Sequence, residues 1–128
     1  MEKFWVGKSD KFNVRSVSAQ YLYERFLTIA STSSTASFGL IVFDPILINQ
    51  PYPLQDTSKA RAYYVDKNTS PYCVYEDYHV MNGRMIISRF DLTNNIVSAT
   101  FEFTTYNSSC GDTVKITDGR FDIGNITR

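Results

Sequence analysis

The sequence predicts one all-β domain of about eight to ten antiparallel strands, most simply a β-sandwich, with a partly open β-barrel as the alternative. The clearest support is residues 97–104, in which apolar Val, Ala, Phe and Phe alternate with polar Ser, Thr, Glu and Thr. A period of two is typical of a half-buried strand. Aromatic residues make up 15% of the chain, with nine Tyr and nine Phe, and both favour strands. The length of 128 residues fits a single domain over residues 1–128.

Segments rich in strand-forming residues recur along the chain, separated by clusters of residues that favour turns. Residues 38–43 are continuously apolar, which predicts a central strand covered on both faces. Residues 26–30 also suit a strand, with one helical turn before it because Leu22 and Phe26 stand at helical spacing. In chain order, the predicted strands are residues 4–6, 12–19, 26–30, 38–43, 60–65, 72–75, 84–90, 97–104 and 113–117.

The connections follow from composition. Residues 31–37 are small and polar, as expected of a hairpin loop. Residues 49–59 contain two prolines and therefore cannot lie inside a sheet. Residues 66–71 and 91–95 are turn clusters, and we expect residues 81–83 to turn the chain into the strand that follows.

The last apolar run changes phase across Asp118-Gly119, between Ile116 and Phe121. A two-residue hairpin turn at Asp-Gly would pair Ile116 with Phe121 on one face of a sheet. A β-bulge with Gly119 in the left-handed region would instead shift the phase within one strand. The pattern is consistent with either geometry.

Charge and hydropathy exclude several classes of partner. Thirteen basic and thirteen acidic residues cancel, whereas nucleic-acid binders usually carry a basic excess. The longest apolar stretch, residues 38–43, is too short to span a bilayer. The first ten residues, MEKFWVGKSD, lack the basic and apolar regions of a signal peptide. We therefore expect either a cytoplasmic protein or the mature part of a secreted one.

Cys73 and Cys110 are the two cysteines, and they do not form a CxxC motif. A zinc site needs four nitrogen or sulfur ligands, and the chain adds only His79. The sequence therefore predicts no metal and no cofactor. The two cysteines form either a disulfide in an oxidising compartment or a pair of buried free thiols.

No pattern of catalytic residues is present. His79 has no accompanying nucleophile motif such as GxSxG, so we interpret it as a surface or turn histidine. Asp91, Asp118 and Asp122 stand at strand ends, where carboxylates usually cap turns or face water rather than bind metal. A glycan-acting hydrolase, the enzymatic alternative, would need two carboxylates that face one cleft.

The tyrosines and the single tryptophan are the other candidates for function. Exposed aromatic side chains can stack on sugars and peptides, although aromatic residues also fill cores without any ligand. Only a contiguous exposed patch would indicate binding. The residues proposed for such an aromatic patch are Trp5, Tyr63, Tyr64, Tyr75 and Tyr78.

The last third of the chain contains an ordered set of motifs. Phe90-Asp91 is followed by Ala-Thr-Phe-Glu-Phe at 99–103, Gly111, Thr-Val-Lys-Ile-Thr at 113–117 and Gly-Arg-Phe-Asp at 119–122. This order resembles the C-terminal signature of small secreted lipoproteins of unknown function from Bacteroidetes. The resemblance implies a β-rich fold and a cell-envelope location, and it assigns no catalytic residue. Such proteins start with a lipidated cysteine after a signal peptide, so we expect a lipid anchor upstream of this segment.

Taken together, these observations favour a non-catalytic cell-envelope protein, either a binding module or a structural component of a surface assembly. Its partner would be a glycan or a protein in the periplasm or at the outer-membrane surface. A cytoplasmic location and a hydrolase activity are the alternatives.

Overall fold

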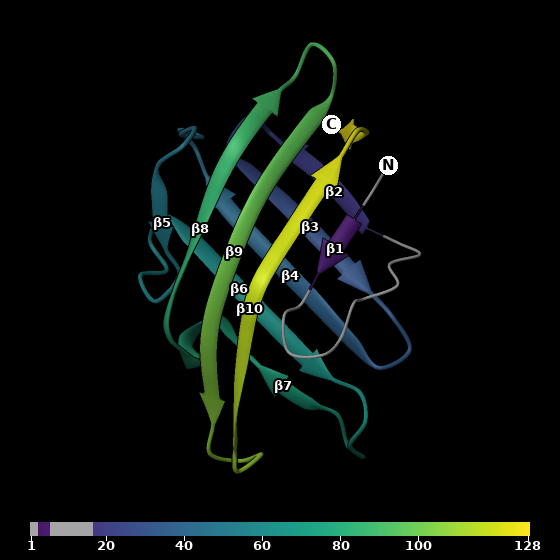
Figure 1. The fold of residues 1–128 in the computed structure, drawn as a ribbon, viewed down its shortest axis with the longest axis vertical. Helices are drawn as coiled ribbons and strands as arrows, with labels where there is room; N and C mark the ends of the chain where they lie inside the picture. The colour runs from purple at the N-terminus through teal and green to yellow at the C-terminus, as the bar shows by residue number, and fades with distance from the viewer. Residues whose placement is uncertain (1–2, 6–16) are drawn as a thin grey trace.

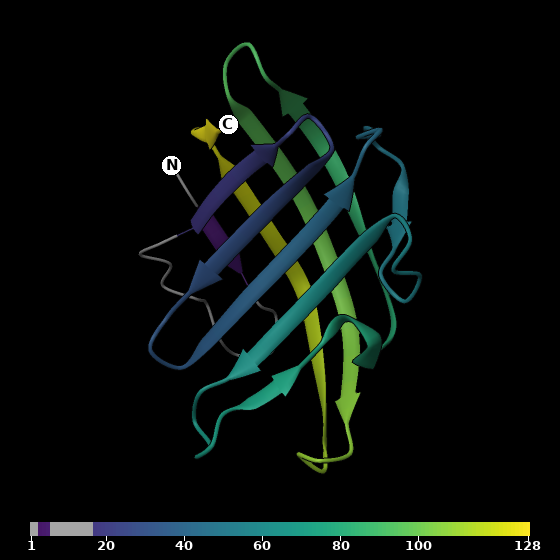
Figure 2. The same ribbon diagram turned by 180° about the vertical axis from the view of Figure 1, so that it is seen from behind.

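The strands pair into two sheets that lie face to face (Figures 1 and 2) and bury apolar side chains between them. The computed structural model describes residues 3–5 and 17–128. The five-stranded sheet has the order β1-β10-β9-β8-β5, and the six-stranded sheet has the order β11-β2-β3-β4-β6-β7. The elements are β1 (Lys3–Trp5), β2 (Val17–Leu22), β3 (Phe26–Thr32), β4 (Ala36–Phe43), β5 (Pro51–Pro53), β6 (Ala60–Asp66), β7 (Cys73–Tyr75), the short 3-10 helix η1 (Asp77–His79), β8 (Val80–Asp91), β9 (Ile96–Asn107), β10 (Asp112–Ile123) and β11 (Ile126–Thr127).

The core lies between the sheets and confirms the predicted sandwich. In β9, Phe101 and Phe103 are buried while Glu102 between them is exposed, as the alternation predicts. Phe38 on β4 of the facing sheet meets Phe101 edge to face, with ring centroids 6.3 Å apart. The two sheets are therefore joined by burial of the apolar residues that recur at every second position, which is the dominant favourable contribution to folding.

The described residues contain eleven strands, compared with the eight to ten expected. The additional strands are two or three residues long and lie at sheet edges. They are too short to show an alternation of apolar and polar residues in the sequence. One of them, β5, contains Pro51 and Pro53 and pairs only with β8. Proline has no backbone N–H group to donate, and an edge strand tolerates this because one of its sides has no partner strand. The fold is also not wholly antiparallel, since β11 pairs parallel with β2. Residues 12–16 of the predicted strand 12–19 lie outside the described residues.

The helical turn expected before residue 26 is a hairpin turn. Tyr23 and Glu24 have φ angles of 55° and 53°, and the N–H of Arg25 donates to the carbonyl oxygen of Leu22 over 3.0 Å. Leu22 and Phe26 lie opposite each other on β2 and β3. A separation of four residues occurs both along a helix and across a three-residue hairpin, which explains the misleading spacing.

The phase change near residue 118 is a β-bulge within one continuous strand, β10. Ile116 pairs with Phe103 and Gly119 pairs with Phe101, so two residues stand opposite Glu102 alone. The left-handed residue is Asp118, with φ 54°, and not Gly119 as expected. Glycine is required at position 119 for another reason: a Cβ atom there would lie 2.5 Å from the ring of Phe101.

Residues 81–83 are part of β8 and not a turn, and a register shift between Val80 and Asn82 marks a second irregularity. Gly83 has φ 152°, and a Cβ atom there would collide with the Cβ atom of Phe103. A glycine that resembles a turn signal in the sequence is thus a site of close strand approach.

A disulfide joins Cys73 on β7 to Cys110 in the turn between β9 and β10, with the Cα atoms 6.0 Å apart. It links the edge of one sheet to the end of the other. Beside it, the side-chain amide of Asn107 donates to the carbonyl oxygen of Val74 over 2.8 Å. Of the two alternatives for the cysteines, the structure contains the bonded pair. Within residues 3–5 and 17–128, no helix is long and apolar enough to cross a membrane.

The hydroxyl group of Thr105 on β9 is fully buried and has no hydrogen-bond partner among the described residues. Because an unpaired buried hydroxyl is costly, we expect Thr105→Val to raise the free energy of unfolding by about 1 kcal/mol. Thr100→Val, at an exposed position on the same strand, should change it by less than about 0.5 kcal/mol. Urea unfolding measures both values, and equal effects of the two substitutions would contradict the prediction.

Tyr21 on β2 donates a hydrogen bond to Asp44 Oδ2 over 2.6 Å. This bond raises the pKa of Tyr21 from 10.0 to about 12, with smaller contributions from burial and from the charge of Asp44. The raised pKa means that the bond contributes stability below pH 10, which is lost as the pH rises towards about 12. We therefore expect the stability difference between the wild type and Tyr21→Phe to shrink between pH 10 and 12. Urea unfolding across this range tests it, and a constant difference would show that the bond does not depend on ionisation.

Candidate functional site

Two members of the aromatic patch proposed from the sequence belong to the interior. Tyr75 is 2% exposed, and burial raises the pKa of its hydroxyl above the ordinary value. Tyr64 packs against the core, with its ring centroid 5.1 Å from that of Phe38 and 5.8 Å from that of Tyr75. Neither ring is available as an exposed platform, because the inward phase of β6 and β7 directs both towards the facing sheet.

The other three residues of that patch come from three different elements, η1, β1 and β6. Tyr78 is 74% exposed on η1, and its ring lies 4.4 Å from the ring of His79. Trp5 lies in β1 opposite Arg120 of β10 by backbone register, and its side chain is outside the described part of the chain. Tyr63 lies on the outer side of the six-stranded sheet, since its neighbours along β6 point inward.

The structure instead shows a larger apolar surface on that outer side. The pairing register places Leu22, Phe26 and Phe43 in one row across β2, β3 and β4. Neighbouring rows add side chains from β4 and β6. We define the aromatic face as the outward side chains of Leu22, Phe26, Ile41, Phe43, Tyr63 and Val65, all of them partly exposed.

The rings of the aromatic face contact one another at an angle. The centroids of Phe26 and Phe43 lie 6.3 Å apart with planes inclined by 58°. Tyr23, in the hairpin beside them, is 82% exposed and lies 6.4 Å from Phe26. The guanidinium of Arg61 is 5.1 Å from the ring centroid of Phe43, within the range of a cation–π interaction. This end of the face therefore combines three inclined rings and one cation.

Gly39 keeps the middle of the aromatic face flat. It lies opposite Tyr63, and a Cβ atom on Gly39 would be 3.2 Å from Tyr63 Cδ2. The tyrosine ring therefore covers the glycine, an arrangement that protects a glycine within a sheet. With no side chain beneath it, the ring lies low over the strands and does not project from them.

No described element packs over the aromatic face, which is the near side of the molecule in Figure 2. Its defining side chains are aliphatic and aromatic, and the register places Thr28 and Arg61 on either side of Ile41 in the same row. The surface therefore offers apolar area for a contact. The only sequence signal was the unbroken apolar run 38–43, which we interpreted as covered on both sides. The burial pattern corrects this: alternate residues of β4 are buried, and Ile41 and Phe43 remain partly exposed.

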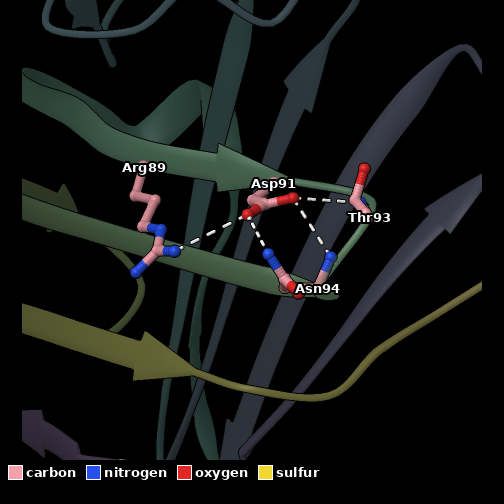
Figure 3. Close-up of polar contacts among 4 residues, drawn as sticks. All are labelled: Arg89, Asp91, Thr93 and Asn94. Atoms are coloured by element: carbon pink, nitrogen blue, oxygen red, sulfur yellow. Dashed lines mark hydrogen bonds and ion pairs between the residues drawn. The ribbon is translucent and has the colours of Figure 1, made fainter.

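Asp91, one of the three aspartates singled out from the sequence, caps the turn between β8 and β9 (Figure 3). Its carboxylate accepts hydrogen bonds from the backbone N–H groups of Thr93 and Asn94, at 3.0 and 3.1 Å, and from the side-chain amide of Asn94 at 2.8 Å. Arg89 lies 3.6 Å away. The bonds from Asn94, chiefly that of its side chain, hold the pKa of Asp91 below the usual range. This carboxylate has a structural role, as its position suggested.

The remaining candidates lie apart from Asp91. Asp122 is bonded to Arg120 over 3.0 Å, and Asp118 lies at the bulge of β10. The Nδ1 atom of His79 accepts a hydrogen bond from the backbone N–H of Glu76 over 2.9 Å, which confirms it as a turn residue. Among the residues that the structure describes, no group of three or more His, Cys, Asp and Glu side chains is placed to hold a metal ion.

Comparison with known proteins places the chain in a family without assigning it an activity. No curated protein and no solved structure matches it. Residues 7–123 match the family described as "Domain of unknown function (DUF6252)". The match includes both sheets of the sandwich apart from the terminal strands β1 and β11. Because the match extends over more than half of the sequence, the chain belongs to the DUF6252 family.

Proposed function

We propose that this protein is a non-catalytic binding module of the cell envelope that docks another protein on its aromatic face. The observation that carries the proposal is the apolar outer side of the six-stranded sheet, where β2, β3, β4 and β6 expose adjoining apolar residues. A contiguous apolar patch with polar surroundings is typical of a protein–protein contact.

The composition of the aromatic face favours a protein over a sugar as its partner. Phe, Tyr and Arg are enriched at the centres of protein interfaces. A sugar chain would need rings that lie flat in one plane, whereas Phe26 and Phe43 are inclined by 58°. The exposed ring of Tyr23 and the guanidinium of Arg61 supply the polar groups that orient a contact with a protein.

The position of the acidic residues supports a non-catalytic role. Glu102 and Asp118 line one depression on the five-stranded sheet, and this is the arrangement that the hydrolase alternative would use. However, Glu102 is ion-paired with Arg84 at 3.2 Å and its side chain is 52% exposed. A glycosidase acid is kept protonated by an enclosed, poorly solvated site. The open sheet surface offers no such enclosure to Glu102.

The envelope location is supported by the resemblance of the C-terminal motifs to secreted lipoproteins and by the Cys73–Cys110 disulfide. Disulfides persist chiefly in oxidising compartments. A sandwich with one bonded pair and a lipid anchor upstream would present the aromatic face to other proteins at the membrane surface.

We expect a photo-reactive amino acid at Ile41, in the middle of the aromatic face, to cross-link one partner in cells of the source organism. The same group at exposed Thr113, on the other sheet, should not capture that partner. The decisive measurement is the affinity of the purified partner. Phe43→Ser should weaken binding at least about tenfold, since a central interface aromatic commonly contributes this much. Tyr72→Ser, at an exposed aromatic outside the face, should leave the affinity unchanged.

An equal affinity for the wild type and Phe43→Ser would refute the docking role of the aromatic face. Circular dichroism of the variant separates this outcome from loss of the fold.

We expect the native protein to fractionate with the cell envelope and to show a bonded Cys73–Cys110 pair in mass spectra recorded without reductant, because an oxidising compartment preserves disulfides. Recovery from the cytosolic fraction with both thiols free would contradict the envelope assignment. It would not bear on the aromatic face itself, since Ile41 and Phe43 lie on β4, whereas Cys73 lies on β7 and Cys110 in the turn between β9 and β10.

A further inference from the structure

The outer side of the five-stranded sheet is the opposite of the aromatic face in character. Two adjoining depressions, of about 330 and 450 Å³, lie over β8, β9 and β10 and share Arg84 and Glu102 in their walls. Both volumes fall within the range of about 300–1,000 Å³ that is usual for ligand sites. The front sheet in Figure 1 is the one that carries them.

The β-bulge of β10 shapes these depressions. Thr117 and Asp118 both stand opposite Glu102, and the two depressions adjoin at this point, since Asp118 lines one and Thr117 the other. Bulges redirect side chains and are common beside functional sites. The bulge gives Asp118 a positive φ of 54°, an uncommon conformation that Asp and Asn adopt more readily than most residues.

The walls of the depressions hold both paired and free charges. Arg84 is fixed by Glu102 at 3.2 Å, and Arg120 by Asp122 at 3.0 Å. Asp118 has neither a hydrogen bond nor an ion pair with any described residue, although it lines the same depression as Arg84 and Arg120. The paired guanidinium groups are held in place and keep further N–H donors, while the Asp118 carboxylate can accept several hydrogen bonds.

These groups select a ligand by its chemistry. An apolar ligand would displace the water that hydrates these charged groups and would form no hydrogen bonds in its place, which is unfavourable. An anionic ligand would gain little, because Glu102 and Asp118 in the combined lining, together with Asp122, the ion-pair partner of Arg120, offset the charges of Arg84, Arg120 and Lys115. A hydroxyl group can donate a hydrogen bond to a carboxylate and accept one from a guanidinium, so it suits a lining that contains both. Hydrogen bonds to charged groups are stronger than those between neutral groups.

We propose that the depressions over β8, β9 and β10 bind a neutral oligosaccharide. Its hydroxyl groups would bond to Asp118, Arg120 and Glu102, and the C–H face of one sugar ring would lie on Ile86 and the methyl group of Thr100, which line the same depression. This site is on the other sheet from the aromatic face, so it is independent of the proposed protein docking. A protein with both sites would connect a glycan to a protein of the envelope.

The test is a titration of the intact, ¹⁵N-labelled chain with neutral cellohexaose, xylohexaose, mannohexaose and chitohexaose, and with acidic hexagalacturonic acid. We expect at least one neutral oligosaccharide to shift the amide signals of residues 100–102 and 118–120 at concentrations of about 1 mM or below. Asp118→Asn should weaken that binding about tenfold, since a charged acceptor is replaced by a neutral one. Asparagine tolerates the same positive φ, so the bulge is preserved.

A second pair of variants tests the position of the site. Thr100→Tyr places a ring in the depression and should abolish binding, whereas Ser98→Tyr, next in line on the outer side of β9 and outside the lining, should not. The proposal is overturned if none of the neutral oligosaccharides shifts these signals, if only the acidic one does, or if Thr100→Tyr binds as well as Ser98→Tyr. Amide spectra that are unchanged away from the substituted position will show that each variant is folded.

Discussion

The ring of Phe101 is the contact on which both sheets of this protein depend. It lies 6.3 Å from Phe38 of the facing sheet and 6.1 Å from Phe121 of the neighbouring strand. Gly119 leaves room for it, since a Cβ atom there would lie 2.5 Å from the ring. Removing a buried phenylalanine costs about 3–5 kcal/mol. The bulge of β10 directly precedes Gly119, so the strand changes phase at the point where it passes this ring.

That accommodation connects the core to the outer surface. The same bulge that lets β10 pass Phe101 sets two residues against Glu102 and hollows the outer side of the sheet. Asp118 consequently takes a conformation with positive φ and carries a carboxylate without a described partner. Close packing on the inner side and a polar depression on the outer side thus occur at the same irregularity of one strand.

The outward positions of the two sheets carry different kinds of side chain. On the six-stranded sheet the outward positions of β4 and β6 carry Ile41, Phe43 and Tyr63, which adjoin across the strands. On the five-stranded sheet the corresponding positions of β8 and β9 carry charged pairs such as Arg84 and Glu102. Exposed ion pairs add little stability, and exposed apolar residues add none while they face water. The outward side chains of both sheets therefore contribute little to the stability of the fold.

Some of these features could be predicted from the sequence, and the errors have identifiable causes. The alternation in β9 correctly placed Phe101 and Phe103 inside, because a period of two is a property of the strand itself. Residues 38–43 were interpreted as covered on both sides. A strand with an exposed apolar outer side and a strand buried on both sides have the same continuous apolar sequence, so the sequence does not distinguish them. Tyr75 was assigned to an exposed patch although it is buried, because Tyr is common in both environments. The phase change at Gly119 fitted a turn and a bulge equally well.

The sequence alone determined the class of fold, the positions of most strands and the absence of a strong charge bias, because these depend on composition and on neighbouring residues. Only the tertiary structure decided that Cys73 meets Cys110, that Asp118 stands at a bulge, and that the aromatic face and the charged depression lie on opposite sheets. Each of these depends on contacts between residues far apart in the chain. A local pattern shows which side of a strand is apolar, but only the packing of the other strands determines whether that side is covered.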